Sequence, residues 1–294
     1  MRMSLAGLAH YAGKNAARFL IALALAVLTI AGQGAAQNPD TMMPDASAAK
    51  AKQILADMIA AFGGPAYLNA RQSECAGRMS QFGHNADLTA YLPFKSYWEF
   101  PDKNRTDIGK KGNVIDLYAG YEGWTLDHDG VGPEPSAQVD NFRAQLPNNP
   151  HYIFRYRLKE EGMNFRWAGL DLIDLKQVDW IELSDSKQRV YRIAVARDTH
   201  LMVRFVVLTP NEANSQPDED ITSYANYHSL DGVQTPLQVS RTHNGRRVFQ
   251  AFYDSCRYNP NLPANFFTKA GLEERFREVG SRSDKKKAAK ARDE

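Results

Sequence analysis

The fold is decided by a stretch near the carboxyl end of the chain, where residues 237–253 read LQVSRTHNGRRVFQAFY. Two runs with strand character, Leu237–Thr242 and Arg247–Tyr253, flank the dipeptide Asn244-Gly245. Asn-Gly is the strongest short-range signal of a hairpin, because a type I′ turn needs positive φ at both central residues. We therefore expect the two runs to pair as antiparallel strands, and Asp231-Gly232 marks another turn just before them.

The returning strand of this hairpin has large side chains on both faces. Alternation along a strand places Val248 and Phe252 on one face and Phe249 and Tyr253 on the other. Because each face carries an aromatic ring, the pattern is typical of a meander that packs on both sides. No catalytic motif lies within it.

The amino terminus has the pattern of a secretory signal. Arg2, Lys14 and Arg18 come without an acidic residue, residues 19–30 are apolar or small, and Gly34-Ala35-Ala36 closes the stretch. The apolar run is shorter than the roughly 20 residues that a membrane span needs, although an uncleaved anchor remains the alternative. Residues 1–36 are therefore predicted to be a signal peptide that is removed on export.

The mature chain divides into a linker, a globular part and a charged tail. Residues 37–47 are polar with two prolines, and residues 281–294 are rich in Lys and Arg and poor in apolar residues. We expect the tail to be disordered. The formal net charge of the whole chain is only +2. Without the basic signal and tail the globular part is acidic overall, which argues against nucleic acid as a partner.

One amphipathic helix precedes the strands. Within residues 48–62, apolar residues recur at spacings of three and four, and Gly63-Gly64 followed by Pro65 ends the pattern. Such a stripe needs an apolar partner surface. The period then changes to two from Glu74 onward, which predicts about ten short antiparallel strands in all.

Residues 136–164 interrupt the strands with a helical pattern. Val139, Phe142 and Leu146 are spaced three and four apart, and two prolines break the run before it resumes. The aromatic residues here are typical of core packing, and the alternative is a mobile helical flap over the sheet. The fold class is therefore α+β, with few helices and a large antiparallel sheet.

No catalytic, cofactor-binding or metal-binding motif emerges from the sequence. His-Glu-x-x-His, a nucleophile elbow and phosphate-binding glycine loops are all absent. Asp127-His128-Asp129 could orient an imidazole as a general base, but it lies in a run of Gly and Pro and is typical of a turn. We predict no cofactor and no metal, and an exported hydrolase using Asp127 and His128 is a distant hypothesis.

The chain has two cysteines, Cys75 and Cys256. They fall in the first and last predicted strands, and an exported protein meets conditions that permit disulfides. A disulfide and two buried free thiols are both compatible with the sequence, because strand adjacency cannot be established from it.

Several turn and strand signatures resemble those of a known family. They are Tyr227, Asp231-Gly232-Val233, Pro236, Cys256-x-x-Asn259-x-x-Leu262, Asn265-Phe266-Phe267, Pro101-Asp102-Lys103-Asn104-Arg105 and Gly120-x-x-Gly123-Trp124. Together they resemble periplasmic lipoprotein carriers of the LolA group, which sort lipoproteins to the outer membrane. The resemblance spans residues 48–271.

The resemblance implies an open half-barrel in which helices cover the concave face of a curled sheet. It also implies a periplasmic, non-catalytic carrier of a lipid, a lipidated protein or another hydrophobic ligand, without a cofactor. In carriers of this group an Arg on an early strand anchors the lid, and the candidates here are Arg78 and Arg105. The helical insert and the basic tail are departures from the compact carriers.

Strand parity and side-chain size give candidates for the hydrophobic wall of such a groove. They are Tyr97, Phe100, Trp124, Trp180, Phe205 and Phe252. The same rings could instead fill a closed core, since pattern alone does not distinguish the two. A second hypothesis is a cell-envelope interaction or scaffold module that docks a membrane-associated complex and carries no ligand.

Overall fold

The computed structural model describes residues 38–83, 85, 87–211 and 216–278. The chain forms two compact units, one up to Met42 and the other from Met43 onward. In the first unit the described residues include the short helix η1 (Pro39–Thr41). The second unit carries the sheet and the cavity. The predicted signal peptide, residues 1–36, and the predicted disordered tail, residues 281–294, lie outside the described residues.

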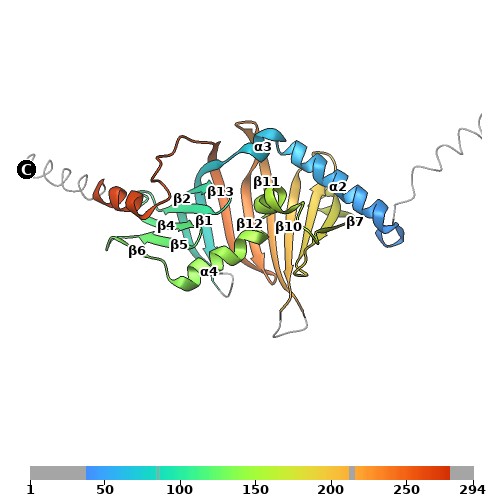
Figure 1. Ribbon diagram of the computed structural model, residues 1–294, viewed down its shortest axis with the longest axis horizontal. Coiled ribbons are helices and arrows are strands. Elements are labelled where there is room, and N and C mark those ends of the chain that lie inside the picture. Colours follow the sequence, from blue (N-terminus) through green and yellow to red (C-terminus); the bar gives the residue numbers. More distant parts are fainter. Residues whose placement is uncertain (1–37, 84, 86, 212–215, 279–294) are drawn as a thin grey trace, which may run out of the picture. The chain divides into compact units, whose positions relative to one another are not determined.

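Within the described residues, thirteen strands form one antiparallel sheet that does not close into a barrel (Figure 1). The order across the sheet is β6-β5-β4-β3-β2-β1-β13-β12-β11-β10-β9-β8-β7. The strands are β1 (Gln72–Phe82), β2 (Leu88–Glu99), β3 (Lys103–Ile108), β4 (Val114–Ala119), β5 (Glu122–Leu126), β6 (Val131–Pro133), β7 (Asn164–Ile173), β8 (Lys176–Ser184), β9 (Val190–Ala196), β10 (Met202–Thr209), β11 (Asp218–Leu230), β12 (Val233–His243) and β13 (Arg246–Tyr258).

The sheet consists of two meanders joined edge to edge. Strands β1–β6 form one and β7–β13 the other, and each strand pairs with its sequence neighbours except where β1 meets β13. We call this β1–β13 pairing the seam. It brings residues about 180 positions apart into register, including Cys75 opposite Cys256. The predicted open antiparallel half-barrel with few helices is confirmed.

The predicted number of about ten strands is wrong, because three strands lack the pattern that the prediction used. β3 is short and polar, β6 lies in a stretch interpreted as a loop, and β7 carries a bulge between Trp167 and Gly169 that breaks its alternation. Conversely, the residues on either side of Pro93, which the pattern divides into two strands, form the single strand β2. The carbonyl of Pro93 accepts from Gly109 on the β3 side, so the missing N–H does not interrupt the ladder with β1.

The two turns predicted from Asn-Gly and Asp-Gly are confirmed. Asn244 and Gly245 have φ of 49° and 76°, and Asp231 and Gly232 have φ of 49° and 79°. Positive φ at both central residues is the type I′ geometry, which matches the twist of the strands on either side. β11, β12 and β13 are thereby set side by side at the centre of the sheet.

Helix α2 (Pro44–Ala61) covers the β7 end of the sheet (Figure 1). It begins four residues before the predicted start, with Pro44 in the first turn, where no backbone N–H is needed. Its buried Leu55 and Met58 belong to the predicted apolar stripe. The hydroxyl of Ser47 accepts a hydrogen bond of 3.0 Å from the backbone N–H of Trp167. This bond provides a partner for one backbone N–H of the edge strand β7.

A close backbone approach follows α2. Gly63 has a φ of 120°, and a Cβ there would lie 2.2 Å from the carbonyl oxygen of Gly232 in the β11–β12 turn. The N–H of Gln234 also donates to the carbonyl of Phe62 over 2.9 Å. Glycine at position 63 therefore lets the end of α2 contact the sheet, and α3 (Pro65–Asn69) leads from there into β1.

The helical insert is bound to the sheet through Arg157. It comprises α4 (Ser136–Gln145), η2 (Leu146–Asn148), α5 (Pro150–Tyr152) and the π-helical segment η3 (Ile153–Arg157). The buried guanidinium of Arg157 donates to Asp185 (2.8 Å) and to the hydroxyl of Tyr191 (2.8 Å), and Asp185 also accepts from Arg189. Burial alone would raise the pKa of Asp185, but these hydrogen bonds outweigh it and hold the pKa well below its usual range.

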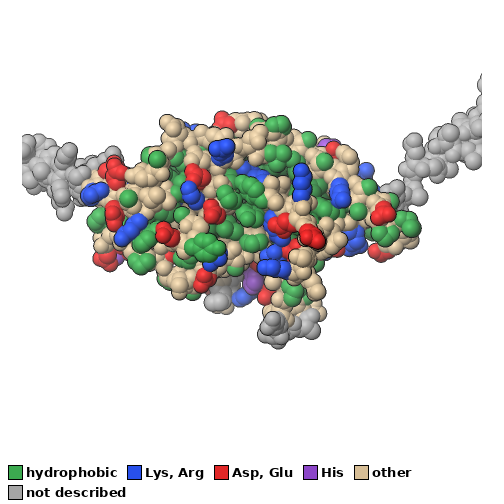
Figure 2. Space-filling view, in the orientation of Figure 1, with side chains coloured by type: hydrophobic (Ala, Val, Ile, Leu, Met, Phe, Trp, Pro, Cys, Tyr) green, Lys and Arg blue, Asp and Glu red, His purple; other side chains and the backbone are tan. Residues whose placement is uncertain are grey.

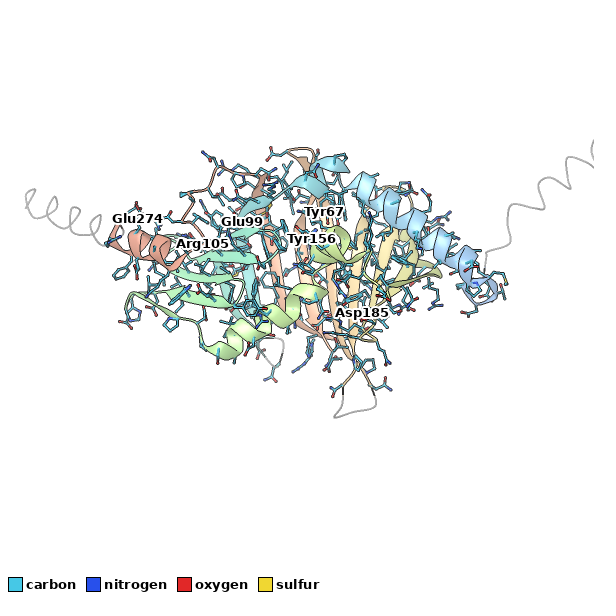
Figure 3. The ribbon with its side chains drawn as sticks, in the orientation of Figure 1. Tyr67, Glu99, Arg105, Tyr156, Asp185 and Glu274 are labelled. Carbon is cyan, nitrogen blue, oxygen red and sulfur yellow. A yellow bond between two sulfur atoms is a disulfide. The ribbon has the colours of Figure 1, made fainter. Side chains whose placement is uncertain are left out.

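The two faces of the sheet are covered by different segments. The inner face carries α2 and the insert. On the outer face, Tyr97, Leu117 and neighbouring residues form a cluster with Phe267 and Leu272 from the chain after β13. Residues 269–278 there are helical. Figure 3 shows Glu274 of this segment beside the β3 region that carries Arg105.

Candidate functional site

A cavity of about 190 Å³ lies on the inner face at the seam. Its floor comes from β1, β2 and β10–β13, and its roof from the end of α2, from α3 and from the insert. The residues that line it are mostly aromatic, apolar or hydroxyl-bearing: Phe62, Tyr67, Ser73, Cys75, Ser96, Trp98, Phe100, Asn149, His151, Arg155, Met202, Tyr224, Tyr227, Val233, Gln234, Thr235, Pro236, Val239, Tyr253, Cys256 and Tyr258. No described lining residue is acidic.

Aromatic rings give the cavity its apolar walls. The ring of Phe62 lies 5.2 Å from that of Tyr67 and 6.3 Å from that of Tyr227, measured between centroids. On the other side, Trp98 stacks on Phe100 at 6.0 Å. Burial raises the pKa of Tyr253 to about 12, so its phenol stays neutral at physiological pH. The walls are therefore apolar rings with uncharged polar tips.

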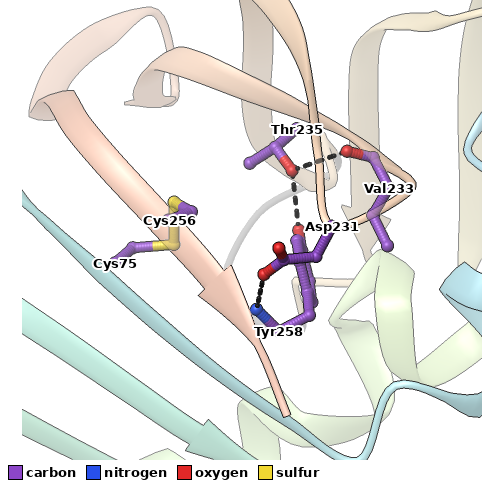
Figure 4. The surroundings of a disulfide bond; sticks show 6 residues. All are labelled: Cys75, Asp231, Val233, Thr235, Cys256 and Tyr258. Carbon is purple, nitrogen blue, oxygen red and sulfur yellow. Dashed lines mark hydrogen bonds between the residues drawn. A yellow bond between two sulfur atoms is a disulfide. The ribbon is translucent and has the colours of Figure 1, made fainter. Parts of the chain in front are cut away.

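The disulfide between Cys75 and Cys256 forms part of the floor (Figure 4). The two residues face each other in the register of β1 and β13. Beside them the hydroxyls of Thr235 and Tyr258 are hydrogen-bonded at 2.9 Å, and the N–H of Tyr258 donates to Asp231 over 2.8 Å. The disulfide thus holds the seam together directly beneath the cavity, while the two hydrogen bonds join β13 to β12 and to the β11–β12 turn.

The roof carries the cavity's ionisable groups. Nδ1 of His151 is 2.9 Å from the hydroxyl of Tyr67. Burial, together with the charge of Arg155, lowers the pKa of His151 to about 3, so this imidazole is neutral at pH 7. The guanidinium of Arg155 lies 4.0 Å from the ring centroid of Phe100 and 4.6 Å from that of Tyr67. Its Nη1 donates to the carbonyl of Ala70.

The structure places one of the six predicted wall residues, Phe100, in the cavity. Phe205 is buried on the inner face against Phe154 and Tyr191 but does not line the cavity. Tyr97 and Trp124 belong to the outer-face cluster.

The other two predicted wall residues also lie on the outer face. Trp180 packs in a separate cluster with Val178 and Val206. Phe252, with 41% of its surface exposed, pairs with Arg78 across the seam. The structure therefore divides the six predicted rings between the two faces of the sheet.

The two candidate lid-anchoring arginines also have different surroundings. Arg105 is buried on β3, pairs with Asp107 at 2.7 Å, donates to the carbonyl of Phe266 over 3.3 Å and stacks on the Phe266 ring. It therefore holds the chain after β13 on the outer face. Arg78 is exposed, 5.6 Å from the ring centroid of Tyr91. Neither side chain lines the cavity.

The remaining candidate chemistry lies away from the cavity. Asp127, His128 and Asp129 bring ligand atoms within 4.8 Å of one another in the β5–β6 turn, where the N–H of Asp129 donates to Asp127. The side chains of His128 and Asp129 are more than four-fifths exposed, as expected for a surface turn. Among the described residues, no helix is long and apolar enough to cross a membrane.

The sequence did not identify most of the residues that line the cavity, because adjacent strand residues place aromatic rings on both faces of the sheet. Tyr97 and Trp98 on β2, and Phe252 and Tyr253 on β13, are neighbouring aromatics that point to opposite sides. Choosing the inner one requires knowing which face the insert covers. Tyr227, one of the residues that carry the family resemblance, lines the cavity, so the resemblance offers a signal for this one position.

Comparison with solved structures agrees with this architecture. A DUF1329 family protein from Desulfovibrio piger superposes with a TM-score of 0.55 at 14% identity, covering 77% of this chain and 99% of that one. A domain from Vibrio parahaemolyticus, assigned to outer membrane lipoprotein sorting, gives 0.52 at 13% identity, with 77% and 99% covered. This chain has the fold of these proteins.

A LolA superfamily protein from Nitrosomonas europaea gives a lower TM-score, 0.48, at 11% identity over 76% of this chain and 99% of that one. No protein-family model matches the sequence, and no curated protein matches it significantly. Identities as low as those of the two structures with the higher TM-scores establish the fold alone.

Proposed function

We propose that the mature protein is a periplasmic carrier that binds a lipid, a lipoprotein acyl chain or another hydrophobic ligand without chemically changing it. The observation that carries the proposal is the aromatic-walled cavity between the seam and the insert. Each CH₂ group moved from water into such a site gains about 0.8 kcal/mol, so a short acyl segment already binds usefully. The fold shared with a domain assigned to lipoprotein sorting supports the same role.

The size of the cavity limits what can enter without movement. At about 190 Å³ it is smaller than the roughly 300–1,000 Å³ of pockets for drug-sized ligands. A longer chain therefore needs the roof to move outward. Figure 2 shows hydrophobic side chains gathered in the middle of the face that carries the insert, with charged side chains around them. Tyr156 of the insert, labelled in Figure 3 in the same orientation, is one exposed ring in this area, with 47% of its surface exposed.

The surroundings of the cavity also support a non-catalytic role. The described lining has no acidic residue, and both of its cysteines are in the disulfide. Its imidazole, His151, is a weak base with a pKa of about 3 and is hydrogen-bonded to Tyr67. A general base near neutrality needs a pKa close to 7.

Native mass spectrometry and lipid extraction of the purified mature protein test the carrier role. A copurifying lipid is expected in the wild type and should be lost in Ser96→Phe, because position 96 lines the cavity and a phenyl ring fills it. Ser240→Phe is the matched control, since Ser240 follows the cavity residue Val239 on β12 and faces the opposite side. Equal lipid content in both variants contradicts the proposal.

A second function, a cell-envelope interaction module without a ligand, is favoured by one surface feature. The β7–β8 hairpin exposes Leu170, Leu172 and Leu175 at 48%, 58% and 90%. Exposed apolar groups of this kind mark interaction sites. A ligand-free protein that captures a membrane-associated partner, and loses it when the three leucines are replaced by Ser, would support this function over the carrier.

A further inference from the structure

Among the described residues, one charged group of the cavity has no counter-ion within ion-pairing distance. Of the described residues that line it, Arg155 alone is charged at neutral pH, because His151 is neutral and no Asp, Glu or Lys takes part. No described carboxylate lies within ion-pairing distance of Arg155, in contrast to Arg157 two residues later, which pairs with both Glu160 and Asp185. A cation facing a largely apolar cavity is costly unless something balances it.

Arg155 also keeps unused hydrogen-bonding capacity. A guanidinium has five N–H donors in a fixed planar arrangement. Nη1 donates to the carbonyl of Ala70, while the buried Nε of Arg155 has no partner. The rings of Phe100 and Tyr67 contact the guanidinium and fix its orientation. Planar donors of this kind match the two oxygens of a carboxylate or phosphate.

The register of the strands gives the cavity a polar end and an apolar end. Arg155 lies over Phe100, the residue next along the chain from the end of β2, close to the level where Ser73 of β1 pairs with Tyr258. Tyr253 pairs with Gly77, four residues further along β1, which corresponds to roughly 13 Å at about 3.3 Å per residue. Beyond it lies the apolar cluster of Met79, Phe94 and Ala251.

We infer that the ligand is an anionic amphiphile whose carboxylate or phosphate binds Arg155 and whose acyl chain runs along the strands toward Tyr253. The inference rests on the proposed carrier function and specifies its ligand class. The head group supplies the missing counter-ion and accepts from the guanidinium, while the chain covers the aromatic floor. Phe100 also borders a surface pocket, so the charged end lies next to solvent. The other residues that line this pocket are Arg71, Gln72, Glu99, Tyr156 and Asn259, and the carboxylate of Glu99 is already bonded to Gln72 and Lys103.

The test compares three ligands of equal chain length: laurate, dodecyl phosphate and methyl laurate. Dissociation constants are measured by calorimetry on the delipidated, oxidised full mature chain, below the concentrations at which these ligands form micelles. At least one anion is expected to bind about tenfold or more tightly than the neutral ester, since hydrogen bonds to a charged group exceed neutral ones. Laurate ahead of dodecyl phosphate identifies a carboxylate head, and the reverse order a phosphate.

Variants then assign the preference to one side chain. Arg155→Met should bring the anions to the affinity of the ester while leaving ester binding intact, and Arg155→Lys should keep part of the preference. Arg143→Met is the matched control, because Arg143 lies on α4 of the same insert, stacks on Tyr121 and does not line the cavity. It should keep the full preference.

Two results overturn the inference while leaving the carrier function in place. They are equal binding of all three ligands by the wild type, which needs no variant to fold, and a preference for anions that survives in Arg155→Met. Binding of none of the three by the wild type overturns the carrier function and this inference together.

Discussion

Removal of the disulfide at the seam should cost the protein a large part of its stability. Cys75 and Cys256 are 181 positions apart in the sequence. In the chain-entropy model, a cross-link that closes a loop of this length destabilises the unfolded state by about 5 kcal/mol at 25 °C. That figure is an upper value, because residual structure in the unfolded chain reduces it. It is comparable to the whole stability of many domains, about 5–15 kcal/mol.

The location of the disulfide at the seam predicts an effect on folding as well as on stability. The seam is where two strands distant in sequence pair, and it joins the two meanders at the cavity floor. Without the cross-link, the β1–β13 ladder has to close a very long loop by hydrogen bonds and packing alone. A variant without the two cysteines is therefore expected to fold more slowly than the oxidised wild type, because the chain loses loop-closure entropy before the non-local contacts form.

The assay is denaturant unfolding of the oxidised wild type and of Cys75→Ala/Cys256→Ala, followed by tryptophan fluorescence. The variant should lose about 3–5 kcal/mol, with a larger m-value because its unfolded state is less compact. Reductant should shift the wild type toward the variant and leave the variant unchanged, since the chain has only these two cysteines. A loss below about 1 kcal/mol, with an unchanged m-value, would refute the entropic reasoning.

Two further predictions concern the segments that cover the inner face. Asp185→Asn should lower the free energy of unfolding by about 1.5–3 kcal/mol, because it removes a charged hydrogen-bond partner of the buried Arg157 and leaves this guanidinium paired with Glu160 alone. Since the folded pKa of Asp185 lies below the unfolded value of about 3.9, its contribution is complete above that pH and is lost as pH falls toward the folded pKa. Unfolding measured from acidic to neutral pH should therefore show a steeper acid loss for the wild type than for the variant, and parallel curves would contradict this. Gly63→Ala should cost more than about 1 kcal/mol by chemical denaturation, because a Cβ meets the carbonyl of Gly232. Gly64 also has a positive φ, so Gly64→Ala is strained as well, but its Cβ would meet open space. It should therefore cost less than Gly63→Ala, and equal losses would show that contact with Gly232 is not the cause.

Local sequence patterns determined the architecture of this protein to a large extent. Asn244-Gly245 and Asp231-Gly232 adopt the positive φ values that their turn type requires, so the central strands could be placed from short-range chemistry. The apolar stripe of α2 and its end at Gly63 likewise follow from periodicity and backbone freedom. These features depend on residues close together in the chain, and a pattern reports them directly.

Which residues line the cavity depends on the face of the sheet to which each ring points and on the segment that covers that face. Tyr97 and Trp98 are adjacent and similar in size, yet one packs under the chain after β13 and the other lines the cavity. The sequence did not single out Arg155 as a candidate binding residue. Its surroundings are the ring of Tyr67 on α3 and the ring of Phe100 next to the end of β2, with no carboxylate nearby among the described residues, and these contacts are set by the tertiary structure. The pairing of Cys75 with Cys256 likewise requires the seam. Sequence periodicity specifies alternation within a strand, but the choice of the inner face is made by long-range packing, which only the tertiary structure contains.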